Sequence, residues 1–473
     1  MVLLKKIANN LFYISLSELI SKLLVFLYTL HLSRVLGAEG LGKLGFAASV
    51  LSFLILFVSI GIDSYGIRTV AQNPTKQKEI VDEIFTLRLI LSILIYSLFL
   101  FLIYNLDLSQ ESKTITIIYC VSLFGHALNM NWVFLAIEKM KPIAIRQIAV
   151  SIVTSICVFL LIDDKDDTII ASAIIGFSTL ISLLIVIIYY VFKVDKINLI
   201  FKISRAKIII YSSITIGISF LITTIYNNVS TYLLGVMIDD DFYQTGIISA
   251  AQKFLALGTL SSIILQQAFF TTFSKMNNNL EEGKSLFLKF LNIMIILGLI
   301  TSIIIFIYAD KIILIQFGDK FIDSIPVLRI LSFNVLLVFL NVLYTTPIVA
   351  WHQEKIFMKS VSIACIFNII LNIILIPHFK AIGVSYIIVF TELITNIALV
   401  YFFRKLYNFS GTKLILKQIL LINLYFIPGY ITYFYYDLVY LSILINLLTI
   451  IFIFYSNNLL TKTFILSLIK KQF

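Results

Sequence analysis

The chain has 473 residues, of which 60% are hydrophobic and only 13% are charged, and it carries a net charge of +11. Three stretches, 168–192, 208–238 and 438–461, contain no charged residue. Each is longer than the roughly 20 residues that an α-helix needs to cross the hydrocarbon core of a bilayer. Together with a mean hydropathy of +1.03, these stretches exclude a soluble globular protein and predict an integral membrane protein.

Apolar segments separated by short polar hinges continue along almost the whole chain. We predict fourteen membrane-spanning helices, at about 10–32, 44–66, 86–106, 114–137, 143–162, 168–192, 208–236, 246–273, 287–308, 325–350, 356–376, 382–403, 418–436 and 438–457. The first span follows Lys5 and Lys6, which resembles the start of a signal peptide. Glu18 and Lys22 within it, and the lack of a small-x-small cleavage site, predict a retained helix instead.

Lysine and arginine concentrate in alternate hinges. The cation-rich hinges are 67–83, 138–147, 193–207, 274–285, 351–355 and 403–417, and the cation-poor hinges are 33–42, 106–113, 163–167, 237–246, 309–323, 377–381 and 437. With the two termini, the first set holds 23 Lys and Arg residues, whereas the second set holds six. Because cation-rich loops stay on the cytoplasmic side, both termini are predicted to be cytoplasmic, which agrees with an even number of spans. No basic block with interleaved aromatics is present, so we expect no nucleic-acid partner.

Two cation-poor hinges are acidic, since 163–167 contains four aspartates and 239–241 contains three. Clustered carboxylates can bind a metal for glycosyl or phosphoryl transfer, but no histidine or further carboxylate lies nearby to complete a site. Outer hinges tolerate acidic residues because these hardly influence orientation. No nucleotide-binding loop of the G-x-x-x-x-G-K-[ST] type occurs either. We therefore expect no metal site and no cofactor.

The two halves of the chain show weak internal repetition. Residues 177–182 (FSTLIS) resemble 390–395 (FTELIT), residues 33–37 (SRVLG) parallel 231–235 (TYLLG), and the Glu-Lys pair at 138–139 parallels that at 354–355. All three matches relate a span to the span six places later. The pattern predicts parallel six-helix repeats about an axis along the membrane normal, with a site between them near the middle of the membrane.

Short motifs throughout the chain resemble one known family. They are residues 36–42 (LGAEGLG), 45–49 (GFAAS), 61–62 (GI), 132–134 (WVF), 138–140 (EKM), 317–321 (FGDKF), 326–331 (PVLRIL), 376–377 (IP) and 381–384 (AIGV). Together they resemble Wzx-type flippases of polysaccharide repeat units, a branch of the multidrug, oligosaccharidyl-lipid and polysaccharide exporter superfamily. The chain departs from the family pattern at Ala38, where proline is common, and at Lys380-Ala381, where glycine-alanine is usual.

This resemblance implies an all-α membrane protein with two six-helix lobes around a central cavity and a C-terminal helix pair. We expect lobes at 1–207 and 208–405, with helices thirteen and fourteen and a cytoplasmic tail at 406–473. The resemblance further implies a cargo of undecaprenyl-pyrophosphate-linked oligosaccharide, which is moved across the bacterial inner membrane for O-antigen or capsule synthesis. Membrane lipids, a coupling proton or sodium ion, and polymerase and chain-length proteins are the implied partners.

Ionisable side chains inside predicted spans are candidates for function, because charge in the hydrocarbon region is costly and usually faces a cavity or a partner. The candidates for substrate binding in the central cavity are Glu18, Lys22, Asp63, Arg88 and Lys253, and those for ion coupling are His126 and Glu392. In the related lipid II flippase family, cations on the first and eighth spans line the cavity. The resemblance thus implies that Lys22 and Lys253 attract pyrophosphate, as point charges where arginine is typical.

Five of these seven candidates also have a structural interpretation. Glu18 and Lys22 are four residues apart and can form an internal ion pair. Arg88 can snorkel to the cytoplasmic membrane edge, and His126 can be a packing residue. Glu392 can make an inter-helix hydrogen bond.

A non-enzymatic flippase that works by alternating access is the function that these features favour. A multidrug exporter or a lipid II flippase of the same superfamily would share the fold, although lysines in the cavity suit an anionic cargo better than cationic drugs. A membrane glycan polymerase or glycosyltransferase is the alternative from another class. Such enzymes usually carry long or acidic catalytic outer loops, and the longest outer hinge here, 309–323, is short and lacks histidine.

Overall fold

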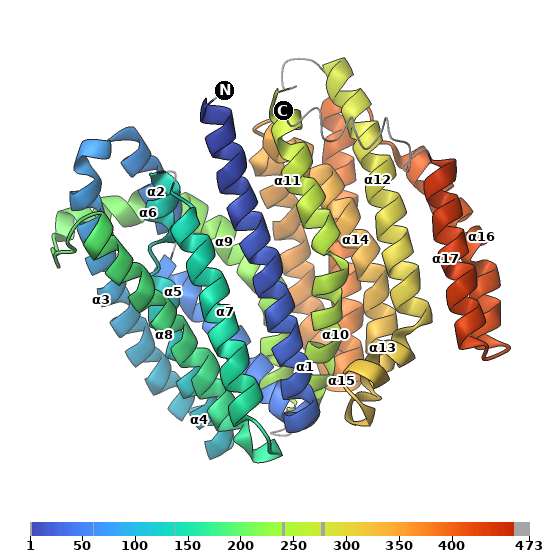
Figure 1. Ribbon diagram of the computed structural model, residues 1–473, viewed down its shortest axis with the longest axis horizontal. Helices are drawn as coiled ribbons and strands as arrows, with labels where there is room; N and C mark the ends of the chain where they lie inside the picture. The colour runs from blue at the N-terminus through green and yellow to red at the C-terminus, as the bar shows by residue number, and fades with distance from the viewer. Residues whose placement is uncertain (1, 60, 138, 239–241, 276–279, 458–473) are drawn as a thin grey trace. The chain divides into compact units, whose positions relative to one another are not determined.

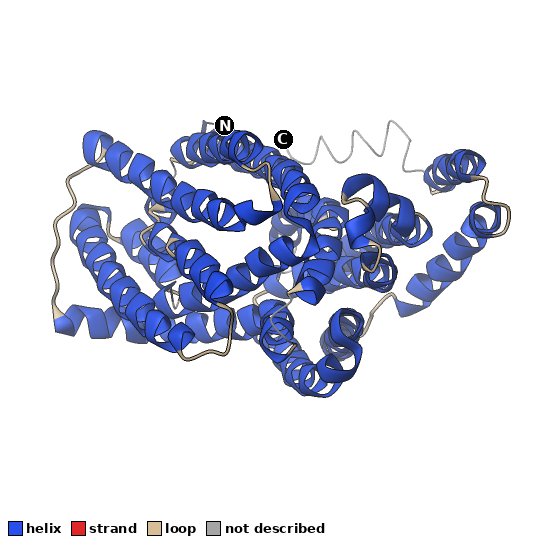
Figure 2. Cartoon of the chain, turned by 90° about the horizontal axis from the view of Figure 1, so that it is seen from below, coloured by secondary structure: helices blue, strands red, loops and turns tan. Residues whose placement is uncertain are grey.

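The computed structural model describes residues 2–59, 61–137, 139–238, 242–275 and 280–457. These residues form helices and connecting loops without any strand (Figures 1 and 2). The helices are α1 (Val2–Ser59), α2 (Ile62–Gln72), α3 (Gln77–Tyr104), α4 (Gln110–Cys120), α5 (Ser122–Ala127), α6 (Asn131–Ala136), α7 (Lys141–Leu161), α8 (Thr168–Lys193), α9 (Ile203–Met237), α10 (Tyr243–Gly258), α11 (Leu260–Lys275), α12 (Leu280–Ile307), α13 (Ala309–Gln316), α14 (Ser324–Ala350), α15 (Glu354–Tyr407), α16 (Thr412–Phe434) and α17 (Val439–Ser456). The all-α membrane fold is confirmed.

Eleven stretches of helix in the described residues are long and apolar enough to cross a membrane. Two of them, Leu16–Gln72 and Glu354–Tyr407, have 57 and 54 residues, more than twice the roughly 20 that one crossing needs. Each covers all or most of two predicted spans. The predicted span 208–236 lies within α9, a helix of 35 residues that is not among the eleven. The count of fourteen spans therefore stays a prediction.

Both very long helices are interrupted by one residue with a positive φ. Gly37 divides α1 (φ 72°, ψ −170°), and Lys380 divides α15 (φ 49°, ψ −130°). Glycine adopts such conformations readily, whereas a residue with a Cβ is strained in them. Lys380 is the position at which the chain departs from the glycine of the family motif. The two interruptions fall within the predicted hinges 33–42 and 377–381.

The predicted fourth span, 114–137, is not one continuous helix. It is divided into α4, α5 and α6, with a turn at 128–130. In this turn Asn129 accepts a hydrogen bond from the backbone N–H of Asn131 over 3.0 Å. Asparagine side chains compete in this way with the hydrogen bonds of a helix, which is why the apolar pattern alone missed the break.

The described helices group into two compact units. Unit 1 comprises Met1–Lys253, Ile313–Ser324 and Val361–Ile387, and unit 2 comprises Phe254–Ile312, Ile325–Ser360 and Ile388–Phe473. The predicted lobe boundaries at 207 and 405 stay a prediction.

At one end of unit 1, four cation-poor hinges lie together. Arg34 donates hydrogen bonds from Nε to the carbonyl of Gln316 and from Nη2 to that of Ile315, over 2.9 and 2.6 Å. The hinges 237–246 and 377–381 are joined by a hydrogen bond from the backbone N–H of Ala381 to Gln244 Oε1 over 3.3 Å. The hinges 33–42, 237–246, 309–323 and 377–381 therefore share one end, as the charge pattern predicted for a common side of the membrane.

Small residues allow α1 and α10 to approach closely at this end. A Cβ on Gly42 would overlap the carbonyl oxygen of Phe242, and a Cβ on Gly246 would overlap that of Ala38. Glycine permits such backbone contact between helices in membranes. This contact and the hydrogen bonds of Arg34 form what we call the hinge cluster.

Two cation-rich hinges of unit 1 are also joined to each other. Arg205 Nε donates to both carboxylate oxygens of Glu83, over 2.9 and 3.1 Å. The backbone N–H of Asn198 donates to Asp82 Oδ1 over 2.9 Å. The hinge 193–207 is thereby fixed to the start of α3, so that 67–83 and 193–207 lie together as the charge pattern requires.

Aromatic side chains form part of the core of unit 2. The ring of Phe287 on α12 lies 4.9 Å from that of Phe403 on α15 and 5.6 Å from that of Tyr344 on α14, measured between centroids. Tyr344 also donates a hydrogen bond to the carbonyl of Ser410 over 2.6 Å. The aromatic cluster thus holds α12, α14 and α15 together just before α16 begins.

Polar contacts attach the last two helices to the rest of unit 2. Tyr433 on α16 donates a hydrogen bond to Asp310 on α13 over 2.7 Å. Asn446 on α17 donates to the hydroxyl of Tyr308 over 2.8 Å, and Tyr308 lies 2.9 Å from the hydroxyl of Ser442. These hydrogen bonds fix α16 and α17 against Tyr308 and the first turn of α13.

Candidate functional site

The first two candidates form an ion pair on α1. Lys22 Nζ lies 2.8 Å from Glu18 Oε1, and the two side chains are 39% and 36% exposed. The pair is therefore internal to the helix, as its spacing allows, and it is also accessible. Next to this pair, Ser17 Oγ on α1 donates a hydrogen bond to Gln147 Oε1 on α7 over 3.4 Å.

Lys253 is half-buried on α10 and belongs to unit 1, like Lys22. No carboxylate of the described residues lies within ion-pair distance of it. No described contact joins it to Lys22. The shared cavity around these two lysines stays a prediction.

Arg88 does not snorkel to the membrane edge, so this interpretation is wrong. Its side chain is 2% exposed and lies 2.8 Å from the Asp63 carboxylate, which is 52% exposed. Asp63 is in the first turn of α2, directly after Gly61, whose positive φ separates α1 from α2. This break places a carboxylate beside Arg88, and a guanidinium with such a partner no longer needs to reach the interface.

His126 lies on the short helix α5 and its side chain is exposed. Arg146 on α7 is close enough to interact with it electrostatically. Arg146 Nη1 in turn donates a hydrogen bond to Ser182 Oγ on α8. The structure thus places a candidate histidine within electrostatic range of a cation that the sequence analysis counted in the hinge 138–147.

Several ionisable residues escaped the sequence analysis as candidates, among them Arg146, His31 and Lys43. Arg146 lies inside the predicted span 143–162, and His31 lies inside 10–32, so the rule used for the other candidates would have found both. His31 Nε2 lies 2.9 Å from the carbonyl of Ile162. Lys43 lies at a predicted boundary, is buried, and pairs with Glu39 and Glu111 at 2.8 and 3.0 Å.

Glu392 is buried on α15 and hydrogen-bonded to the neighbouring helix. Asn341 Nδ2 on α14 donates to Glu392 Oε1 over 2.8 Å, which is the inter-helix hydrogen bond of the structural interpretation. One turn later, Asn396 donates to the carbonyl of Leu337 over 3.0 Å. Its Oδ1 atom, like that of Asn334, is buried without a hydrogen-bond partner in the described part of the chain. Buried oxygen atoms therefore accumulate along the contact between α14 and α15.

An apolar groove of about 610 Å³ runs between α12, α14 and α16 within unit 2. Three polar side chains, Ser302, Ser332 and Asn423, interrupt its otherwise apolar and aromatic lining. Ser302 already donates to the carbonyl of Ser332 over 2.7 Å. Phe333 and Leu420 on its walls are more than half exposed, so the groove is open along the outer surface of these helices.

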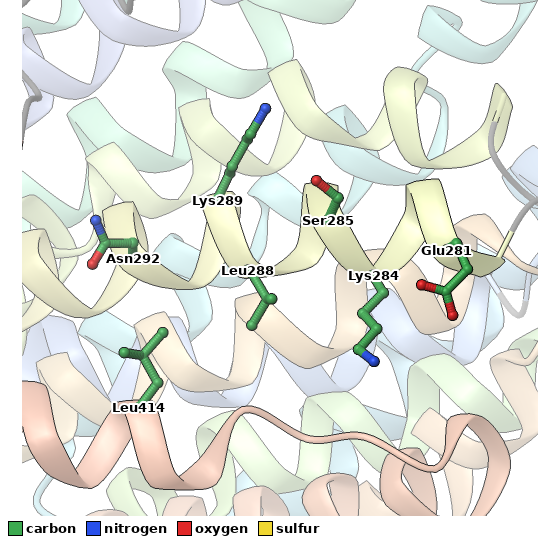
Figure 3. Close-up of a pocket in the computed structure, with 7 residues that line it drawn as sticks. All are labelled: Glu281, Lys284, Ser285, Leu288, Lys289, Asn292 and Leu414. Atoms are coloured by element: carbon green, nitrogen blue, oxygen red, sulfur yellow. The ribbon is translucent and has the colours of Figure 1, made fainter.

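A second cavity of about 540 Å³ lies nearer the start of α12 and α16. Lys284 and Lys289 contribute positive charge, whereas Glu281 contributes negative charge. Figure 3 shows that Lys284 and Lys289 point to opposite sides of α12. Lys284 Nζ also lies over the ring of Phe409, 5.8 Å from its centroid. The two ammonium groups therefore do not converge on one anion.

The acidic hinge 163–167 uses its carboxylates to form its own turn. Asp167 accepts hydrogen bonds from the backbone N–H groups of Asp163 and Asp164, over 3.0 and 2.9 Å. The residues that the structure describes contain no group of three or more His, Cys, Asp or Glu side chains able to hold a metal. The acidic hinge 239–241, Glu138 and the tail 458–473 lie outside the described residues.

Charge pairing shifts two pKa values in the hinge 193–207. The hydrogen bond from Lys78 lowers the pKa of the Asp195 carboxyl, and the two groups lie 2.8 Å apart. The hydrogen bond to Glu83 raises the pKa of Arg205. Asp195 and Arg205 are therefore charged at neutral pH, and their pairs with Lys78 and Glu83 join this hinge to α3.

Comparison with known proteins agrees with this architecture. The family described as "Polysaccharide biosynthesis protein" matches residues 7–277, more than half of the chain. The capsular polysaccharide biosynthesis protein CapF of Staphylococcus aureus is 22% identical over 404 residues, which cover 84% of this chain and 100% of CapF. A protein of Escherichia coli (strain K12) with the provisional name O-antigen transporter is 25% identical over 404 residues, which cover 83% of this chain and 96% of that protein.

Solved structures of transporters share the fold. The lipid II flippase MurJ in an inward closed conformation has a TM-score of 0.78 at 16% identity, covering 94% of this chain and 99% of MurJ. A multidrug resistance transporter of the MATE family and MOP superfamily, in its inward-facing conformation, has a TM-score of 0.66 at 15% identity, covering 82% of this chain and 94% of that one. At such identities the likeness establishes the fold alone. The chain belongs to the polysaccharide biosynthesis protein family of multi-pass membrane proteins, as its resemblance to the Wzx-type flippases predicted.

Proposed function

We propose that this protein is a flippase that moves undecaprenyl-pyrophosphate-linked oligosaccharide repeat units from the cytoplasmic to the outer leaflet of the bacterial inner membrane. It works by alternating access, without catalysing a reaction, and serves O-antigen or capsule synthesis. The apolar groove along α12, α14 and α16 is the observation that carries this proposal. A prenyl chain is apolar along its whole length, and an open groove with exposed apolar walls can hold it at the protein surface.

The charged candidates of unit 1 suit the polar part of the cargo, which is the pyrophosphate with its glycan. A pyrophosphate and a hydrated glycan cannot cross hydrocarbon unaided, because a charge there costs several kcal/mol or more. Lys22 is accessible beside Glu18, and Lys253 has no carboxylate partner in the described residues. We assign these two ammonium groups to the pyrophosphate, with Glu18, Asp63 and Arg88 as the surrounding charges that set the local potential.

The driving force must come from an ion or a cargo that binds the two conformations with different affinity. Glu392 is the first candidate for carrying a proton or sodium ion, because its buried carboxylate lies one turn from the unpartnered Oδ1 of Asn396. Hard cations bind such oxygen ligands. His126 is the second candidate, since it is accessible beside Arg146.

A reconstituted assay tests the function. The purified protein in vesicles should transfer a fluorescent polyprenyl-pyrophosphate glycan between leaflets, and an imposed proton or sodium gradient should change the rate. A requirement for ATP, or chemical alteration of the sugar during transfer, would contradict the proposal. Transport of cationic drugs in preference to the lipid-linked glycan would favour a multidrug exporter of the same superfamily.

The orientation has its own test. With Cys157 replaced by Ala, a cysteine at Asp166 should react with an impermeant thiol reagent in whole cells, and a cysteine at Lys196 should not. Both positions are exposed, so accessibility within the protein is matched. The opposite labelling pattern would reverse the topology and the direction of transport.

A further inference from the structure

A notch of about 340 Å³ opens on unit 1 where α6, α7 and α8 meet. Figure 1 shows α7 and α8 side by side, in teal and green. Lys141 and Arg146 line it from α7, Tyr189 and Ile185 from α8, and Phe134 from α6. We call it the α7–α8 notch. It is separate from the groove and from the candidate ion pairs described above.

The notch is positively charged, and one hydrogen-bond donor of its lining residues lacks an acceptor among the described residues. Its eight lining residues include two cations and no carboxylate. Arg146 uses Nη1 for its hydrogen bond to Ser182, but its Nε atom is buried and has no partner in the described part of the chain. A buried N–H without an acceptor destabilises a structure. An anionic acceptor that entered the notch would lie near both the incompletely paired Arg146 and Lys141.

The walls of the notch are apolar and face outward. Ile145 is 58% exposed, Ile185 is 41% exposed and Tyr189 is 38% exposed. The Tyr189 ring packs against the buried ring of Phe134, with centroids 5.7 Å apart. Exposed apolar side chains on a membrane helix contact lipid chains. The notch therefore combines a cationic part with a surface suited to hydrocarbon.

Its position along the helices matches the level of lipid headgroups. α7 begins at Lys141 and α8 ends at Lys193, so the notch lies at the ends of both helices that adjoin the cation-rich hinges 138–147 and 193–207. The amino-terminal end of α7 adds the positive end of its helix dipole. Basic pockets between membrane helices at this level are suited to anionic headgroups.

We infer that the α7–α8 notch binds one anionic phospholipid of the cytoplasmic leaflet. Its phosphate accepts hydrogen bonds from the Arg146 guanidinium and the Lys141 ammonium group, and its acyl chain lies against Ile145, Ile185 and Tyr189. The cavity at the start of α12 lacks this combination, because its two lysines diverge (Figure 3) and Glu281 shares its lining. The inference concerns a bilayer lipid and goes beyond the proposed transport function.

Lipid retention measures this site directly. The full chain is placed in nanodiscs of equal parts phosphatidylglycerol and phosphatidylcholine, extracted in mild detergent, and its bound lipids are counted by native mass spectrometry. The wild type should retain one phosphatidylglycerol in preference to phosphatidylcholine. Lys141→Gln and Arg146→Gln should each reduce this preference about fivefold, since one Lys or Arg near anionic lipid contributes about 1 kcal/mol, which is roughly a fivefold change in binding. Lys207→Gln removes the same charge from an exposed site outside the notch and should leave the preference unchanged.

A second variant keeps the test decisive if the charge variants fail to fold. Ile145→Trp preserves both cations but fills the notch, and it should also release the phosphatidylglycerol. Retention of the lipid by every folded notch variant at the level of Lys207→Gln would overturn the inference. Displacement of phosphatidylglycerol by an added polyprenyl pyrophosphate would overturn it too, because the notch would then be a cargo site.

Discussion

The ammonium group of Lys22 lies 2.8 Å from a carboxylate oxygen of Glu18, one turn earlier on α1. Both side chains remain more than one third exposed, so the pair is neither sealed inside the protein nor isolated from a ligand. Its position within a predicted membrane span therefore suggests that Lys22 is retained for an interaction other than the pair itself.

The two roles of Lys22 make opposite predictions for a double substitution. If Lys22 attracts the pyrophosphate, Lys22→Ala should abolish surface glycan at normal protein level, and Glu18→Ala with Lys22→Ala should abolish it as well. Lys22→Arg keeps the charge and should retain function. The measurement is surface glycan on a deletion strain that expresses each variant. Restored glycan in the double variant would show that Lys22 merely neutralises Glu18.

The response of glycan transfer to an ion gradient should depend on the charge of Glu392 more than on its hydrogen bond. Glu392→Gln preserves a carbonyl oxygen that can accept from Asn341 but cannot bind or release a proton. We expect this variant to fold normally and to lose the response of glycan transfer to an imposed ion gradient. Asn341→Leu is the matched change, because it removes the donor and leaves the carboxylate. If Glu392→Gln keeps the full gradient response, the residue is only an inter-helix contact.

The apolar pattern of the sequence was sufficient for the fold class, because membrane helices must satisfy every backbone hydrogen bond internally. It was insufficient for the breaks within helices. Gly61 separates α1 from α2, and Asn129 interrupts the fourth predicted span. Neither residue changes the hydropathy of its segment enough to mark a boundary, since both act through local backbone geometry.

The candidate site was predictable only as far as residue type. A charge inside a span identified Arg88 and Glu392, but their partners Asp63 and Asn341 depend on which helices pack together. The charge pattern also predicted the arrangement of the hinges, since four cation-poor hinges that are far apart in the chain, 33–42, 237–246, 309–323 and 377–381, have residues that lie together at one end of unit 1. The charge rule succeeds there because it concerns the side of the membrane, which all hinges of one set must share.

Lys380 should be a site where glycine stabilises the protein. Its φ of 49° and ψ of −130° are strained for a residue with a Cβ, at a cost of about 1–3 kcal/mol. Relief of this strain by glycine is partly offset, because glycine loses more conformational entropy on folding, at a cost of about 0.5–1 kcal/mol. We expect Lys380→Gly to raise the free energy of unfolding by about 1 kcal/mol. Ala381→Gly, within the continuing helix, should lower it by a similar or smaller amount. Denaturant unfolding in detergent compares the two, and destabilisation by Lys380→Gly would contradict the strain argument.

The two ion pairs of the hinge 193–207 should contribute differently to the stability of the protein. Arg205 holds Glu83, which is almost fully buried, whereas Lys78 and Asp195 are both more than one third exposed. Arg205→Gln leaves a buried carboxylate without its cation and should destabilise by on the order of 2 kcal/mol, less than a sealed pair because Arg205 itself contacts solvent. Lys78→Gln should have no measurable effect. Thermal unfolding in one detergent checks both variants.

The Lys78–Asp195 pair should also be insensitive to mild acid. The pKa of Asp195 is lowered by Lys78, so its contribution to stability is complete above the pKa of an unfolded aspartate, about 3.9, and is lost only as the pH falls through the lower folded value. The difference between Lys78→Gln and the wild type should therefore stay constant from pH 8 to pH 5. A change within that range would mean that another group titrates.

We expect the contacts of the hinge cluster to break during each transport cycle. Arg34 satisfies the last carbonyls of α13, at Ile315 and Gln316, as cations commonly do at the ends of helices. Because repeat-built transporters alternate by moving helical bundles around a central site, a path that opens at this end requires these contacts to break. A covalent link across them should therefore stop the cycle.

Cysteines in place of Arg34 and Ile315 provide such a link, since both native side chains are exposed. A short reducible bifunctional thiol reagent should join them and reduce glycan transfer at least tenfold, and reduction of the linker should restore it. Each single-cysteine variant treated in the same way should keep its activity, which separates the effect of linking from that of losing the Arg34 hydrogen bonds. Full transfer by the linked protein would show that this end remains closed throughout the cycle, and the cargo would then have to leave by another route.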